Sequence, residues 1–199
     1  EIIPVLFDYP DIIPSPSDHV HPDGPLILWN HRWEHDKDPN TFFEALHRLD
    51  AMGRPFRVSL CGQKFSRVPE CFTQGIKALK SHIVHEAPLA SRVDYTALLS
   101  EVDVVISTAQ HEFFGISMLE AALSGAYPLV PNRLVYPEIY PQEFQYQSLD
   151  QLVSRLDELV NDYLEGVSLR ADRRHLFEQL THNVDEQFRS LFDKACAHG

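Results

Sequence analysis

The fold of this chain is decided by residues 102–130, which read VDVVISTAQHEFFGISMLEAALSGAYPLV. The apolar run from Val102 to Ser107 is typical of a buried parallel strand. A helical pattern opens at Gly115 and closes at Gly125, which suits a left-handed helix C-cap, and residues 127–130 predict the next strand. The stretch therefore predicts a strand, a tight loop, a helix and a second strand, which is the repeating unit of an α/β fold.

Two carboxylates occupy distinctive positions in this unit. Glu112 lies in the loop at the carboxyl end of the strand, where open α/β sheets bind ligands. Glu120 lies one to two turns into the helix. The first-turn amides from Gly115 to Met118 point an unpaired, partly positive helix end into the space between them. We expect a diphosphate to bind at this helix end, with the two glutamates binding the hydroxyl groups of sugars on either side.

The rest of the chain repeats the same unit. Strands are expected at residues 25–30, 57–61 and 81–85, and helices after an N-cap at Asp38 or Asn40 and at residues 69–79 and 93–100. Four such units, joined by right-handed crossovers, predict a doubly wound parallel α/β sheet of the Rossmann type. Beyond the sheet, a short helical turn is expected at 137–140 and extra C-terminal helices at 149–164 and 169–197.

A basic pair, Arg32 and Lys37, follows the first expected strand. Parallel strands end at the same edge of a sheet, so this loop should lie beside the helix that begins at Gly115. The two cations would then contact the diphosphate from the side opposite the amides. Taken alone, the pair is equally well explained as a salt-bridged surface loop, because Glu34, Asp36 and Asp38 lie among these residues.

Another candidate, Gly62, directly follows the second expected strand. A glycine there permits either a tight turn or the close approach of backbone to a ligand.

Two glutamates separated by seven residues, followed by E-A-x-x-x-G and an apolar strand, resemble the donor-binding motif of retaining GT-B glycosyltransferases. The blocks HRWEHDKDP at 31–39 and HEFFG at 111–115 are similar to the more specific family of glycosyltransferase-like proteins related to tRNA-queuosine α-mannosyltransferase. The resemblance extends from Leu26 to about Phe192 and covers the family's C-terminal, donor-binding half. One departure is His31, because the wider family usually has glycine before the arginine.

The resemblance implies a metal-independent, retaining hexosyl transfer without a protein nucleophile or cofactor. In this family the donor is GDP-mannose and the acceptor is queuosine in tRNA. It implies catalytic roles for Glu112, Arg32 and Lys37, with the two cations and the Gly115 amides stabilising the leaving diphosphate. Glu112 would hold the transferred sugar and Glu120 the nucleotide ribose. The further donor-binding residues that it implies are Gly62, His111, Phe113, Phe114, Gly115, Ile116 and Ser117.

Composition limits where such a protein acts and what it binds. The formal net charge is −12, so this domain is not expected to bind tRNA by itself, and the acceptor would be held mainly by another domain. No apolar run approaches the ~20 residues needed to span a bilayer. An odd number of cysteines without C-x-x-C spacing, at positions 61, 71 and 196, fits a reducing cytoplasm.

The first 25 residues contain six prolines and are expected to form an interdomain linker. Residues 26–199 would then form the donor-binding domain. The chain begins without Met, and we expect a fragment that lacks the N-terminal acceptor domain and is inactive by itself.

Three alternatives remain open. His19 and His21 could join His31 and His35 in a metal site, but no carboxylate or cysteine spacing supports one, and no metal is expected. The chain could also be a non-catalytic nucleotide-sugar binding module. A sugar-nucleotide epimerase or a phosphorylase relative would share the two-domain fold, although no sequence context suggests a pyridoxal-phosphate lysine.

Overall fold

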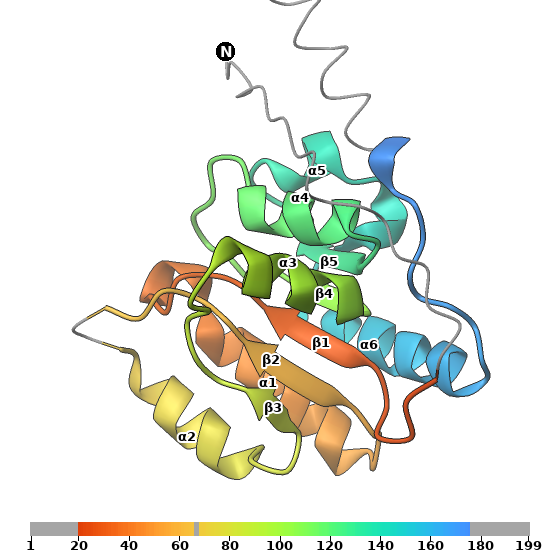
Figure 1. The fold of residues 1–199 in the computed structure, drawn as a ribbon, viewed down its shortest axis with the longest axis horizontal. Coiled ribbons are helices and arrows are strands. Elements are labelled where there is room, and N and C mark those ends of the chain that lie inside the picture. The colour runs from red at the N-terminus through yellow and green to blue at the C-terminus, as the bar shows by residue number, and fades with distance from the viewer. Residues whose placement is uncertain (1–19, 66–67, 176–199) are drawn as a thin grey trace, which may run out of the picture.

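The computed structural model describes residues 20–65 and 68–175 (Figure 1). Six strands form one parallel sheet in the order β3-β2-β1-β4-β5-β6. The strands are β1 (Leu26–Trp29), β2 (Arg57–Leu60), β3 (Ile83–His85), β4 (Val104–Ile106), β5 (Tyr127–Pro131) and β6 (Gln145–Tyr146). The helices are α1 (Pro39–Ala51), α2 (Glu70–Ala78), α3 (Arg92–Glu101), α4 (Ile116–Leu123), α5 (Tyr136–Ile139) and α6 (Leu149–Leu164). Two short 3-10 helices, η1 (His35–Lys37) and η2 (Gln142–Phe144), complete the described elements.

The doubly wound α/β prediction is confirmed by the two layers of helices that cover the sheet (Figure 1). Alternate residues of β1 enter two separate cores, because successive side chains of a strand point to opposite faces. Ile27 and Trp29 pack in the core formed with α1, α2 and α6. Leu26 and Leu28 pack in the core formed with α3, α4 and α5. Burial on both faces explains why the strands read as continuous apolar runs.

The strand order creates a reversal point that positions the site. From β1 the chain adds β2 and β3 on one side, and then crosses to add β4, β5 and β6 on the other side. Ligands bind in open α/β sheets at the carboxyl ends of the two strands that flank such a reversal. Here those strands are β1 and β4, which pair through Ile27 with Val104 and Leu28 with Val105.

Local sequence signals explain how α1 begins. The Asp38 side chain accepts a hydrogen bond from the Thr41 amide at 3.2 Å, and Pro39 occupies the first turn. Of the two expected N-caps, Asp38 is therefore the one that caps the helix. Gly125, after α4, has the expected left-handed backbone at φ 108°.

The helix predicted from residue 169 is wrong at its start. Residues 167–173 follow an irregular path along the ends of α3 and α4. Arg170 is buried there and donates hydrogen bonds to the carbonyls of Leu99, Val102 and Ser124. A cation bound to the last carbonyls of two helices is stabilised by both helix dipoles, which outweighs the local helical pattern. The remainder of that predicted helix, residues 176–197, lies outside the described residues, as do residues 1–19 of the expected linker.

The two-residue strand β6 was not predicted, because it is too short to show a periodic pattern. No helix in the described part of the chain combines the length and apolar character that crossing a membrane requires.

Candidate functional site

The loops that follow β1 and β4 are joined at the carboxyl edge of the sheet, as predicted. The Asp36 carbonyl accepts hydrogen bonds from the amides of Gln110 at 2.8 Å and His111 at 3.2 Å. In the same direction, from the loop after β4 to the loop after β1, the Thr108 hydroxyl donates to the Lys37 carbonyl at 2.8 Å. These hydrogen bonds to main-chain carbonyls hold the two loops in one register at the reversal point of the sheet.

Lys37 and Glu112 meet at this junction. The Lys37 side chain is only 8% exposed, and its Nζ lies 3.1 Å from Glu112 Oε2 and 3.4 Å from Asp36 Oδ2. It also donates a hydrogen bond of 2.6 Å to the His111 carbonyl. A buried ammonium with two carboxylates and a carbonyl around it is fixed in place and compensated in charge.

The Glu112 carboxylate also accepts backbone hydrogen bonds from its own loop. Its Oε1 accepts from the amides of Phe113 at 3.0 Å and Phe114 at 3.4 Å. Burial acts to raise the pKa of Glu112, but the charge of Lys37 and the hydrogen bonds from Lys37 and the Gly115 amide outweigh it and lower the pKa below its ordinary value. Glu112 is therefore an ionised acceptor at neutral pH, and these loop amides face its carboxylate.

Gly115 opens α4 with a backbone that other residues avoid. Its φ is 76°, and a Cβ at this position would lie 3.0 Å from the Tyr136 ring. The Tyr136 hydroxyl is in turn hydrogen-bonded to the Ser107 hydroxyl at 2.7 Å, which holds the ring against the loop. The first hydrogen bond within α4 runs from the Leu119 amide to the Gly115 carbonyl. The amides of residues 116–118 precede it at the helix start, where an anion is stabilised.

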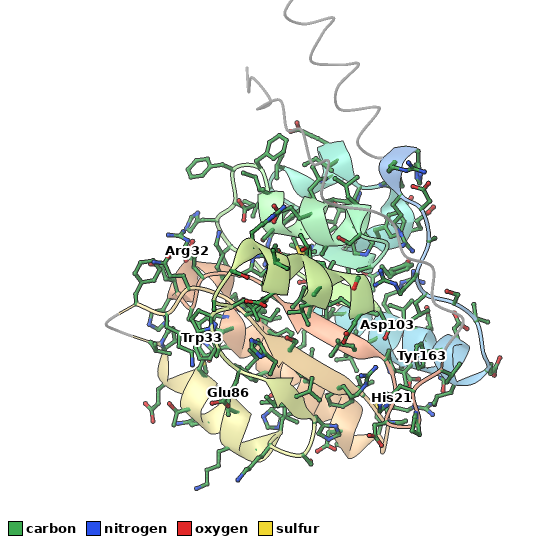
Figure 2. All side chains as sticks on the ribbon, in the orientation of Figure 1. His21, Arg32, Trp33, Glu86, Asp103 and Tyr163 are labelled. Atoms are coloured by element: carbon green, nitrogen blue, oxygen red, sulfur yellow. The ribbon has the colours of Figure 1, made fainter. Side chains whose placement is uncertain are left out.

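Arg32 lies at the same edge but is half exposed (Figure 2). Its guanidinium pairs with Glu34 Oε2 at 2.8 Å and with Asp36 Oδ2 at 3.5 Å. Asp36 thus pairs with both Arg32 and Lys37. The two residues form a salt-bridged loop, and this loop lies at the edge of the sheet where a diphosphate-binding pair was expected. Figure 2 shows Arg32 at one end of the sheet and Asp103 at the other, where Asp103 accepts a hydrogen bond from the Leu26 amide.

Gly62 makes a close backbone approach, but to the chain itself. A Cβ on Gly62 would lie 1.5 Å from the His31 carbonyl oxygen and 3.0 Å from the Trp33 ring. The sequence left open a tight turn or the close approach of backbone to a ligand, and the contact that this geometry shows is a different one, the tight packing of the loop after β2 against the loop after β1. Gly62 therefore lies against the backbone that leads to Arg32 and Lys37.

His31, the departure from the wider family, is buried directly after β1. Its side chain packs edge-on against Trp29, with ring centroids 5.1 Å apart, and its Nε2 has no hydrogen-bond partner among the described residues. Burial, opposed in part by Glu112 and reinforced by Lys37, lowers the pKa of His31 from 6.5 to about 4. This imidazole is neutral at neutral pH, so it adds no charge beside Lys37.

We expect His31 to make the fold sensitive to acid. The unfolded chain binds this proton below pH 6.5 and the folded chain only below about pH 4, so stability is lost as the pH falls through that interval. The loss should reach about 3 kcal/mol at pH 4. Urea denaturation from pH 7 to pH 4 measures it, and His31→Asn should flatten the dependence. Glu112, Asp36 and Lys37 act on the same ring, so the contribution of His31 is the difference in the free energy of unfolding between the wild type and His31→Asn at each pH. Parallel pH dependences of the two proteins would contradict this prediction.

The second carboxylate, Glu120, lies apart from Lys37 and faces α3. It is 8% exposed, and its Oε1 accepts a hydrogen bond of 2.7 Å from the Arg92 guanidinium. Sequence reasoning missed Arg92. The available signal was a cation in the first turn of a helix, where the helix dipole disfavours positive charge unless an acid lies nearby.

The remaining predicted site residues surround the start of α4 with different exposures. Phe113 is 90% exposed and Ile116 is 41% exposed. Phe114 and Ser117 are half-buried, and His111 is exposed and contributes its carbonyl to Lys37. Within residues 20–65 and 68–175, no group of three or more His, Cys, Asp or Glu side chains is placed to share a metal ion.

The chain is similar to known proteins in sequence. The family model for Glycosyl transferases group 1 matches residues 15–174. A tRNA-queuosine alpha-mannosyltransferase from Drosophila melanogaster is 45% identical over 130 residues, which cover 65% of this chain and 34% of that relative. This chain therefore spans about a third of the length of the relative.

Solved glycosyltransferase structures share the fold at low identity. The C-terminal domain of the group 1 glycosyl transferase LpcC from Francisella tularensis matches with a TM-score of 0.65 at 17% identity, covering 83% of this chain and 94% of that one. Anabaena HepE, solved in complex with UDP, matches with a TM-score of 0.69 at 16% identity, covering 86% of this chain and 49% of that one. With its Rossmann-like parallel sheet and the family match over most of its length, the chain belongs to the group 1 glycosyl transferases and has the domain fold of a GT-B glycosyltransferase.

Proposed function

We propose that this chain is the donor-binding domain of a retaining hexosyltransferase that uses GDP-mannose and modifies queuosine in tRNA. The observation that carries the proposal is the Lys37–Glu112 pair, held beside the start of α4 at the reversal point of the sheet. The named activity of the Drosophila relative supports the sugar and the acceptor, and the UDP complex of HepE supports a nucleotide at this fold.

In this proposal the anionic leaving group is stabilised by fixed charges and dipoles. Three neighbouring oxygens hold the Lys37 ammonium in place, so its charge would stabilise a diphosphate electrostatically, and a direct hydrogen bond would replace one of those three contacts. Arg32, at the exposed end of the same ion-pair chain, adds a planar donor. The amides at the start of α4 add the helix dipole from the opposite side.

The two glutamates would bind hydroxyl groups on either side of the diphosphate. Glu112 is ionised and would accept hydrogen bonds from the transferred sugar, while Glu120 would accept them from the ribose. The acceptor hydroxyl attacks the anomeric carbon on the face that the diphosphate leaves, and the departing diphosphate takes up the hydroxyl proton. This reaction uses no protein nucleophile and no metal, and it retains the configuration at the anomeric carbon.

We further propose that the acceptor-binding half lies outside this chain and that the protein acts in the cytoplasm. The net charge of −12 is consistent with a domain that leaves tRNA binding to another part of the protein. By itself the chain should bind the donor and transfer nothing, because the reaction takes place between two halves.

A thermal-shift panel tests donor binding. Ligand binding to the native state raises the melting temperature, and GDP-mannose at about 100 times its Kd should stabilise the chain by about 2.7 kcal/mol, or about 5–10 °C. UDP, ADP and their sugars should shift it less. A larger rise in melting temperature with UDP-sugars would show that the donor carries uracil and not guanine. No shift with any nucleoside diphosphate would refute donor binding.

Catalysis is tested separately, in the protein at its natural length. GDP-mannose and tRNA that contains queuosine should give mannosylated tRNA. Donor binding without transfer or hydrolysis would favour the alternative of a non-catalytic nucleotide-sugar binding module.

A further inference from the structure

Glu120 is one of a group of polar side chains that extends from the end of β1 to α3 and α4. Asn30 directly follows β1, and its side-chain amide donates to the Ser117 carbonyl at 2.7 Å and to the Tyr95 hydroxyl at 3.1 Å. Because a carbonyl oxygen only accepts, the atom of Asn30 that faces Ser117 must be the amide nitrogen. This fixes the direction of the Asn30 side chain, and the Tyr95 oxygen accepts from it.

Since its oxygen accepts from Asn30, the Tyr95 hydroxyl directs its own hydrogen elsewhere, and the neighbouring acceptor is Glu120. Burial raises the pKa of Tyr95 well above its ordinary value, and the charge of Glu120 and a hydrogen bond to it act in the same direction. Tyr95 is therefore neutral, and its hydroxyl hydrogen is available to the Glu120 carboxylate.

Arg92 approaches the same carboxylate from the start of α3. Its guanidinium donates to Glu120 Oε1 at 2.7 Å and lies 5.4 Å from the centroid of the Tyr95 ring. A carboxylate that is 8% exposed is stable in its ionised form only when charge and hydrogen bonds compensate for the lost water. Arg92 supplies the charge and Tyr95 a donor, and a carboxylate has about four lone-pair sites, so acceptor capacity remains for further hydroxyl groups.

We propose that Asn30, Tyr95 and Arg92 are positioning residues that orient Glu120 toward the vicinal hydroxyl groups of a nucleoside ribose. This proposal rests on the proposed function, in which Glu120 binds the ribose of the donor. It adds that the ribose preference depends on α3 and on the end of β1 as well as on the glutamate itself. None of the three residues needs to touch the ribose.

The test compares ribose with 2′-deoxyribose, because a merely structural role would not change that preference. Calorimetric titration of the chain with GDP, UDP and ADP and with their 2′-deoxy counterparts gives two Kd values for each base. The ribose preference is the Kd of the 2′-deoxynucleotide divided by the Kd of the ribonucleotide. In the wild type we expect the ribonucleotide to bind more tightly. Tyr95→Phe should reduce the ratio about tenfold by weakening ribonucleotide binding, while leaving the affinity for the 2′-deoxy form unchanged. Arg92→Lys keeps the charge and should retain more of the preference than Arg92→Gln.

Tyr127→Phe is the matched control. The Tyr127 hydroxyl donates to the Glu143 carbonyl at 2.8 Å, on β5 and away from Glu120, so this variant loses a hydroxyl hydrogen bond but should keep the wild-type ratio. If the wild type prefers ribose and both Tyr95→Phe and Arg92→Gln keep that Kd ratio, the positioning roles are overturned. The proposed function would still stand in that case. Binding without any ribose preference in the wild type would also overturn the positioning roles. Failure to bind any nucleoside diphosphate would overturn the proposed function as well.

Discussion

Replacement of Lys37 by methionine is expected to lower turnover of the whole protein by 100-fold or more and to weaken the binding of GDP to this chain. The ammonium is the most buried cation of the site and contacts Glu112, Asp36 and the His111 carbonyl. Removing one preorganised group that stabilises developing negative charge costs on the order of 100- to 1000-fold in rate. Initial-rate kinetics with GDP-mannose, together with calorimetry on the chain, measure the two effects.

The same substitution should also destabilise the fold, and the two effects can be separated. Loss of Lys37 leaves the Glu112 carboxylate without its countercharge, which costs about 3 kcal/mol for a buried pair. The double variant Lys37→Met/Glu112→Gln removes both charges and should recover most of that stability while remaining inactive. Lys77→Met is the matched control, because Lys77 is an exposed lysine on α2. Turnover near the wild-type value in Lys37→Met would refute the catalytic role.

Gly62→Ala should impair both folding and nucleotide binding although position 62 need not touch a ligand. A methyl group here would lie 1.5 Å from the His31 carbonyl oxygen and 2.6 Å from its carbon. These are backbone atoms that cannot rotate away, so the loop that carries Arg32 and Lys37 must shift. We expect a loss of about 3 kcal/mol in the free energy of unfolding and at least a tenfold loss in GDP affinity.

Gly75→Ala distinguishes loop displacement from general destabilisation. A Cβ there would lie 2.3 Å from the Phe43 ring in the core between α1 and α2, away from the site. This variant should lose stability but keep its GDP affinity below its melting temperature. Equal affinity in the Gly62 and Gly75 variants, with both folded, would show that the position of the loop after β1 does not matter for binding.

Much of the site could be predicted from the sequence because parallel topology is a strong constraint. Lys37 and Glu112 are 75 residues apart, yet each follows a buried strand by a few residues. Parallel strands end at the same edge, so the two loops had to meet if β1 and β4 were neighbours. The Asp38 N-cap, the glycine that opens α4 and the C-cap at Gly125 were likewise local signals, because each depends on a few adjacent residues.

Contacts between helices could not be predicted in this way. Arg92 and Glu120 meet because α3 and α4 pack side by side on one face of the sheet, and the periodicity of either helix leaves the rotation of its partner undetermined. The irregular path of residues 167–173 has the same origin, since Arg170 binds carbonyls at the ends of those two helices.

The sequence by itself determined the doubly wound sheet, the edge at which the site forms and the residue types that reach it, because apolar periodicity and helix caps act over short distances along the chain. Only the tertiary structure decided which charges pair, that His31 is buried and neutral, and that Gly62 packs against the backbone of the neighbouring loop. Those outcomes depend on distances of a few ångströms between segments far apart in sequence, and such distances are fixed only when the two cores are packed.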